Sequence, residues 1–210
     1  MRVFILCTGR SGSSAIIKAC KHIENYTTGH ETLTEKIAIE RFHYPDNHIE
    51  ADNRLSWQLG QINKLFGDET FYVHLKRDKD AVAKSFMRRF FQWSIIDVYC
   101  EGIKKTPPFK LKRSERLAAC YDYIETVNSN IEFFLSDKTK KMEIHLENIE
   151  NEFPEFWKQI NASGNLEKAL NEFQTKHNAS GNRIKINLSY RIKKIVLTEI
   201  EFLKMTFKFR

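Results

Sequence analysis

The sequence predicts an α/β fold of three layers, in which helices cover both faces of a central, mainly parallel sheet. Short continuous apolar runs are rich in β-branched and aromatic residues, as in strands that are buried on both faces. Stretches of helical periodicity follow these runs, and strands that alternate with helices build such a sandwich. A chain of 210 residues with a hydrophobic fraction of 41% suits one domain. We therefore expect a single domain over residues 1–210.

The chain is expected to open with a strand, a tight loop and a helix. Residues 3–7 form an apolar run that ends at Thr8 and Gly9. The small polar loop that follows leads into a helix over residues 14–23, whose apolar side chains recur on one side. Another strand is expected to end near residues 27–31, close to the crevice of the sheet.

The same unit recurs in the second quarter of the chain. Residues 70–75 predict a buried strand, and Asp78 is suited to cap the helix after it. Residues 33–41 and 55–66 are predicted to be helical, and a turn at residues 44–47 separates them.

The second half of the chain is predicted to be mostly helical. Thr106-Pro107-Pro108 breaks the chain, and a long helix is expected over residues 114–134. Residues 141–146 predict a third strand, and several helices follow, the last over residues 190–205. The sequence contains no internal repeat and no low-complexity segment.

The composition predicts a polyanionic ligand. The formal net charge is +7, from 34 Lys and Arg against 27 Asp and Glu. A basic surface suits nucleic acid, a membrane surface, an acidic polysaccharide or a phosphorylated nucleotide. Basic residues gather only in a loose cluster, interpreted as a solvated loop, at Lys104, Lys105, Lys110, Lys112 and Arg113. Because no aromatic platforms accompany basic residues on one face, we expect no nucleic-acid partner.

The cysteines and the apolar runs predict a cytoplasmic protein without a membrane span. None of the four cysteines belongs to a C-x-x-C pair, so the sequence supports neither a zinc site nor a thioredoxin-type motif. Cys7 lies in an apolar run and is expected to be buried. A reducing compartment is the simplest interpretation. The longest apolar stretches are far shorter than a bilayer requires, and we recognise no signal peptide.

The first loop is a candidate phosphate cradle. It reads Thr8-Gly9-Arg10-Ser11-Gly12-Ser13-Ser14. Two glycines allow an anion to approach the backbone closely, and the amides at the start of the next helix supply partial positive charge. Arg10 adds a planar guanidinium group that matches phosphate or sulfate oxygens. The plainer alternative is a Gly/Ser turn that only caps a helix.

The same loop argues against a nucleoside triphosphatase. That chemistry requires the pattern G-x-x-x-x-G-K-[ST], and here Ser13 stands where the lysine belongs. The missing lysine weighs against hydrolysis of ATP or GTP.

Two segments resemble the nucleotide-binding motifs of sulfotransferases that use 3′-phosphoadenosine-5′-phosphosulfate (PAPS). Residues 4–14 resemble the family's 5′-phosphosulfate loop, and residues 74–85 are similar to its 3′-phosphate segment. In the latter an Arg ends a strand and a Ser follows eight residues later, here Arg77 and Ser85. At the rise of a helix Ser85 lies about two turns into it, so both side chains can converge on one phosphate. The plainer alternatives are an ion pair for Arg77 and helix packing for Ser85.

Two weaker similarities follow later in the chain. Residues 143–149 resemble the strand and acidic segment of many family members, for which a structural role is expected. Residues 177–183 resemble a C-terminal loop that closes over the nucleotide in some members, which would make Arg183 a nucleotide contact.

The resemblance implies a P-loop-like sulfotransferase fold, PAPS as co-substrate and no metal. It implies nucleotide contacts from Arg10, Ser11, Gly12, Ser13, Ser14, Arg77, Ser85 and Arg183. Arg10 would also stabilise charge on the leaving group. In some family members the region after the first helix supplies a catalytic glutamate, which makes Glu31 the first candidate for the general base and His30 the second. His43, His48, Glu50 and Asp52 remain alternative bases, and capping of the next helix is the plainer role for Glu31.

Three rival functions stay open. They are a P-loop-type nucleotide kinase, a nucleotide- or nucleic-acid-binding module without activity, and a sulfotransferase fold that has lost catalysis. The acceptor is expected to carry a hydroxyl group, with a carbohydrate slightly preferred over a lipid or small metabolite. The sequence assigns neither the acceptor nor an oligomeric state.

Overall fold

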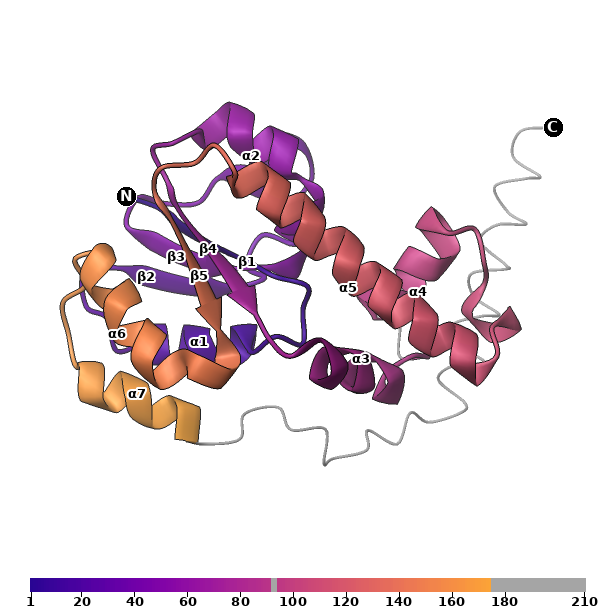
Figure 1. Ribbon diagram of the computed structural model, residues 1–210. Helices are drawn as coiled ribbons and strands as arrows, with labels where there is room; N and C mark the ends of the chain where they lie inside the picture. The colour runs from indigo at the N-terminus through magenta and orange to yellow at the C-terminus, as the bar shows by residue number, and fades with distance from the viewer. Residues whose placement is uncertain (92–93, 175–210) are drawn as a thin grey trace. The chain divides into compact units, whose positions relative to one another are not determined.

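The computed structural model describes residues 1–91 and 94–174, which fall within one compact unit, Met1–Asn178. Five parallel strands form one sheet in the order β2-β3-β1-β4-β5, with helices on both faces (Figure 1). The strands are β1 (Val3–Leu6), β2 (Thr27–His30), β3 (His48–Ala51), β4 (Phe71–Lys76) and β5 (Lys141–His145). The predicted α/β class and parallel sheet are confirmed, whereas a single domain over the whole chain stays a prediction.

Strand β1 lies at the centre of the sheet and is completely buried. Its side chains alternate between the two faces, so Phe4 and Leu6 join one hydrophobic core while Val3 and Ile5 join the other. A strand that serves two cores needs apolar residues at every position, which explains the continuous apolar run in the sequence.

The helices divide between these two cores, as Figure 1 shows for α2 and α5 on one side and α1 and α6 on the other. The first core is covered by α2 (Leu59–Phe66), α3 (Lys79–Arg88), α4 (Ile95–Val98) and α5 (Arg113–Leu135). The second is covered by α1 (Ser13–Cys20), α6 (Ile149–Gln159) and α7 (Leu166–Gln174). Short 3₁₀ or π turns link them: η1 (Ala38–Phe42), η2 (Asn53–Trp57), η3 (Tyr99–Ile103), η4 (Pro108–Lys110) and η5 (Leu146–Asn148).

Most predicted elements of the first half are present, within a residue or a few of their expected bounds. The carboxylate of Asp78 accepts a hydrogen bond from the Ala81 amide at 2.8 Å, so the predicted cap of α3 is confirmed. The predicted helix over residues 55–66 is divided at Gln58 into η2 and α2. Strand β2 ends at His30, within the range of residues 27–31 that the sequence predicted.

The predicted helix over residues 33–41 is wrong. Only η1 forms there, because Thr32 and Thr34 bond to the buried carboxylates of Glu50 and Asp52 and draw the chain against β3. Ala38 also adopts a left-handed backbone with φ of 52°, which interrupts helical geometry.

No helix in the described part of the chain is long and apolar enough to cross a membrane. The closing helix predicted over residues 190–205 and the nucleotide contact predicted at Arg183 lie outside the described residues.

The topology creates a crevice at the carboxyl ends of β1 and β4. The two strands are neighbours in register, with Leu6 opposite His74, so they end side by side. Helix α1 then packs on one face of the sheet and α3 on the other. Loops that diverge in this way leave a crevice between them, which is where open α/β sheets bind ligands.

Candidate anion-binding site

The loop after β1 turns sharply into α1. Gly9, Arg10 and Gly12 have φ angles of 77°, 59° and 102°, and Gly12 is the N-cap of α1 without any side-chain cap. A Cβ at Gly12 would lie only 2.7 Å from the Cδ1 atom of Leu146. The first amides of a helix have no carbonyl partner within it, so those of Ser13 and Ser14 can bind an anion, whereas the Ala15 amide donates to the carbonyl oxygen of Gly12 at 2.9 Å.

The loop is held from behind by two hydroxyl groups. The Tyr123 hydroxyl donates to the carbonyl oxygen of Thr8 at 2.7 Å, and the Ser56 hydroxyl donates to that of Cys7 at 3.2 Å. Ser11 is buried beside the Cys7 thiol. Cys7 itself is buried, as predicted. These contacts form the loop before any ligand arrives.

The structure brings Arg10, Arg77 and Ser85 together in the crevice. Arg10 Nε donates to Ser85 Oγ at 3.0 Å, and Arg77 Nη1 donates to the carbonyl oxygen of Arg10 at 3.1 Å. Ser85 is buried on α3, and both guanidinium groups remain partly exposed. The side chains that were assigned to two phosphate segments far apart in the sequence are therefore neighbours.

Two further arginines extend this group into a cationic cluster. Arg88 follows Ser85 by three residues, so both lie on one side of α3, and Arg89 is the C-cap of the same helix. Burial lowers the pKa of Arg10 below its ordinary value, and the positive charges of Arg89, Arg77 and Arg88 lower it further.

No carboxylate in the described part of the chain pairs with the arginine cluster, defined as Arg10, Arg77, Arg88 and Arg89. None of the ion pairs among residues 1–91 and 94–174 involves any of the four. Like charges held together without a carboxylate favour the binding of an anion. Sequence reasoning missed Arg88 and Arg89, although their helical spacing from Ser85 could have revealed them.

His30, at the carboxyl end of β2, contacts the hydroxyl groups of the loop. Its Nε2 atom lies 3.0 Å from Ser13 Oγ and 3.3 Å from Ser14 Oγ. The ring is otherwise exposed, so it stands at the mouth of the crevice beside the start of α1.

The next residue, Glu31, turns away toward the segment after β3. One carboxylate oxygen accepts a hydrogen bond from Asn53 Nδ2 at 2.6 Å, and the other accepts from Arg54 Nη1 at 3.0 Å. Asn53 in turn lies against Gly9 of the phosphate loop. Glu31 therefore sits at the rim of the site in a left-handed backbone, with φ of 55°. Its two partners were not found from the sequence, since they follow the strand β3 that the sequence did not reveal.

The carboxylates considered as alternative bases are engaged inside the protein. Glu50 is fully buried and accepts from the Thr32 amide and hydroxyl at 2.7 Å each, with His48 Nε2 at 3.0 Å. Asp52 is also fully buried and pairs with Arg41. These groups attach the segment after β2 to β3, and only His43, which contacts Glu40, is exposed.

The segment after β5 closes the crevice from another side. Leu146 packs against Gly12, and a carboxylate oxygen of Glu147 accepts a hydrogen bond from the Asp78 amide at 3.0 Å. Both contacts fix the position of this segment, while the structural role expected for residues 143–149 stays a prediction.

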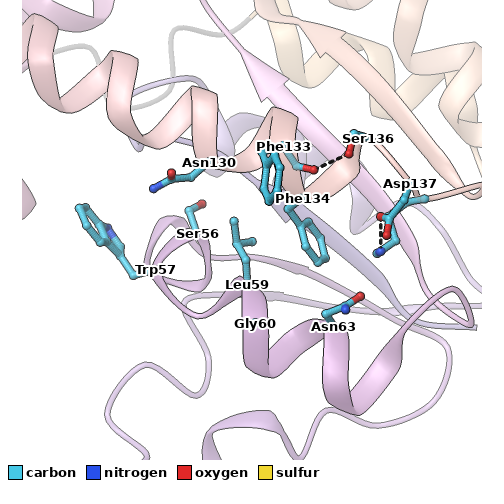
Figure 2. A pocket seen from close by; sticks show the side chains of 11 residues that line it. Ser56, Trp57, Leu59, Gly60, Asn63, Asn130, Phe133, Phe134, Ser136 and Asp137 are labelled. Carbon is cyan, nitrogen blue, oxygen red and sulfur yellow. Dashed lines mark hydrogen bonds and ion pairs between the residues drawn. The ribbon is translucent and has the colours of Figure 1, made fainter.

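A separate pocket of about 450 Å³ lies between η2, α2 and the end of α5. Figure 2 shows Trp57, Phe133 and Phe134 around it, with the amides of Asn63 and Asn130 from the two facing helices. None of the predicted site residues lines this pocket. Among the described residues, no three His, Cys, Asp or Glu side chains gather as a metal site would require.

No protein-family model matches this sequence, and a search among curated proteins returns no relative.

Proposed function

We propose that this protein is a sulfotransferase that moves the sulfuryl group of PAPS to a hydroxyl group of an acceptor. The arginine cluster carries the proposal, because it gathers four positive charges around the loop after β1 and helix α3, and none of them forms an ion pair with a described residue. PAPS offers two anionic groups about one nucleotide apart, and its 3′-phosphate alone carries about −1.5 to −2 charges. The order of the two motifs in the sequence supports the same nucleotide.

Each anionic group has a matching part of the crevice. The phosphosulfate would bind the loop amides and the start of α1, with Arg10 beside it. The 3′-phosphate would bind Arg77 and Ser85, while Arg88 and Arg89 add charge around it. A P-loop nucleotide kinase is less well supported, because it would require a lysine at Ser13.

The transfer requires an in-line arrangement. The acceptor oxygen forms a bond to sulfur while the bond from sulfur to the 5′-phosphate oxygen breaks, and that leaving oxygen gains negative charge. Arg10 and the amides at the start of α1 would stabilise this charge, since they are fixed before the reaction. No step requires a metal, because the arginine cluster supplies the positive charge.

The acceptor hydroxyl must lose its proton to a base at the mouth of the crevice. Glu31 and His30 both lie there, and the contacts favour His30. Its Nε2 atom already faces the hydroxyl groups of Ser13 and Ser14, whereas both oxygens of Glu31 accept hydrogen bonds from Asn53 and Arg54. We assign the proton transfer to His30 and keep Glu31 as the second candidate. The acceptor would approach past the segment after β2, with carbohydrates as the first class to screen.

Calorimetry with 3′-phosphoadenosine-5′-phosphate (PAP) and with ATP tests the proposal. We expect PAP to bind in the presence of a chelator, and ATP to bind far more weakly with or without magnesium. Transfer from labelled PAPS to a panel of hydroxyl acceptors then tests activity. Magnesium-dependent binding of ATP in preference to PAP would identify a kinase-like enzyme, and binding of neither nucleotide would refute the proposal.

A further inference from the structure

The segment between α4 and α5 exposes apolar side chains. Val98, Ile103 and Phe109 are 57%, 58% and 76% exposed. Scattered exposed hydrophobic residues are common on soluble proteins, but three within residues 98–109 form a local concentration.

The same segment is strongly basic. Between Glu101 and the start of α5, the chain carries five positive charges, at Lys104, Lys105, Lys110, Lys112 and Arg113. Lys104 pairs with Asp122 at 2.7 Å, whereas the other four make no ion pair with any residue that the structure describes. The exposed apolar groups are thus interspersed with cations that are free to meet an external anion. We call residues 98–113 the basic–apolar segment.

Hydrogen bonds to backbone carbonyl groups hold this segment in place. The Thr106 amide donates to the carbonyl oxygen of Cys100 at 2.9 Å, and Arg116 Nε donates to that of Leu111 at 2.9 Å. Lys104 also packs over the ring of Tyr99. Because the backbone is anchored at both ends, Phe109 is presented to solvent and does not fold back onto the core.

The segment lies toward the same end of the sheet as the arginine cluster. Helix α5 ends next to the start of β5, where Lys141 Nζ donates to the carbonyl oxygen of Leu135. The last residue of α5 therefore lies at the amino ends of the strands, and its first residue, Arg113, lies toward their carboxyl ends. Tyr123 of α5 contacts the phosphate loop at Thr8, and the helix begins at Arg113, about 15 Å farther along its axis.

We propose that the basic–apolar segment binds the surface of a bilayer that contains anionic lipids. Apolar side chains gain about 25 cal/mol per Å² when they leave water, and an interfacial bilayer region accepts them at a shallow depth. The surrounding cations are attracted by the negative surface potential. Single-stranded nucleic acid would also attract the charges, but the aliphatic Val98 and Ile103 offer no ring on which a base could stack. The combination therefore favours a membrane, and it does not depend on the proposed sulfuryl transfer.

Co-sedimentation with vesicles tests this interaction in the full-length protein without any nucleotide. We expect binding to vesicles of phosphatidylcholine with about 30% phosphatidylserine, and loss of that binding in high salt or with phosphatidylcholine alone. Lys110→Gln with Lys112→Gln should weaken binding about 30-fold, since each cation near the surface contributes about fivefold. Phe109→Ser should weaken it by about tenfold.

Matched variants elsewhere serve as controls. Phe133→Ser removes a ring that is 84% exposed on α5 outside this segment. Lys21→Gln with Lys64→Gln removes two exposed charges, one from the C-cap of α1 and one from α2. We expect both to bind like the unmodified protein. Equal losses from these controls, or no binding to anionic vesicles, would overturn the proposal. Binding of single-stranded RNA in place of vesicles at the same salt concentration would also overturn it and would identify a nucleic-acid surface.

Discussion

Replacement of Arg77 by alanine distinguishes a dedicated 3′-phosphate site from a general attraction of anions. Arg77 lies at the end of β4, where its guanidinium group donates to the carbonyl oxygen of Arg10. In our proposal the remaining donors of this group bind the 3′-phosphate of PAP. Adenosine 5′-phosphate (AMP) lacks that phosphate, so Arg77→Ala should weaken PAP and barely affect AMP.

The expected loss follows from the strength of a charge-assisted hydrogen bond. Such a bond contributes about 1.5–3 kcal/mol, which corresponds to a loss of about 10- to 150-fold in affinity for PAP. The lower half of this range is favoured, because removal of Arg77 also relieves its repulsion with Arg10. Loss of that repulsion should raise the pKa of Arg10 toward its ordinary value.

Calorimetry with PAP and AMP measures both affinities, and Lys84→Ala supplies the matched control. Lys84 is an exposed cation on α3, next to Ser85, and its removal should change neither affinity. The contact between Arg77 and the backbone of Arg10 raises the concern that the loop itself shifts. A shifted loop would weaken PAP and AMP alike. Equal losses for the two nucleotides would therefore refute the assigned role, as would an unchanged affinity for PAP.

Three other predictions concern catalysis, packing and pH. His30→Asn should leave PAP affinity intact and slow transfer from labelled PAPS by at least about 100-fold, while Glu31→Gln should slow transfer less. A larger loss of transfer rate in Glu31→Gln than in His30→Asn would make Glu31 the base. Gly29→Ala should lower the free energy of unfolding by at least about 2 kcal/mol, because its Cβ would lie 2.1 Å from Thr32 Oγ1 and 2.3 Å from Glu50 Oε2. The control Gly60→Ala on α2 meets no atom within 4 Å and should raise the free energy of unfolding by about 0.5–1 kcal/mol. Urea titrations measure both changes. Burial raises the pKa of the Cys20 thiol above its ordinary value of 9.0, so the folded chain keeps a proton that the unfolded chain loses. The free energy of unfolding should then fall above about pH 9, by up to about 1.4 kcal/mol per pH unit for this thiol, and a slope unchanged by Cys20→Ala would contradict this account.

The central part of the fold was predictable because its signals are local. Val3 to Leu6 are apolar at every position, since β1 packs on both cores, and the Gly/Ser loop directly after it marks the turn into α1. The cap at Asp78 likewise needs only its own helix. Where the physical cause lies within a few residues, the sequence is sufficient.

Strand β3 escaped prediction because its physical cause is not local. His48 and Glu50 would be costly to bury alone, and they are tolerated because Thr27 and Thr32 bond to them from β2 and the segment after it. A sequence pattern does not reveal such partners. The missed strand also concealed the position of Asn53 and Arg54 beside Glu31.

The candidate site was likewise predictable only in part, where the positions of its residues follow from local spacing. The motif spacing was enough to propose that Arg77 and Ser85 converge on one phosphate, but it placed Arg10 in a second anion pocket. The structure brings all three together. The contact of His30 with Ser13 and Ser14 depends instead on the strand order, which places the ends of β2, β3 and β1 in one row. Such an order is a property of the assembled sheet.

The separation of the hydrophobic interior into two cores has a consequence for ligand binding. The sheet divides the apolar side chains, and α1 and α3 belong to opposite halves although both begin at the crevice. An anion held by the start of α1 and by the arginines around α3 would join these halves like a noncovalent crosslink. Its effect should then extend to residues far from the crevice, as slower amide hydrogen exchange in both layers at once.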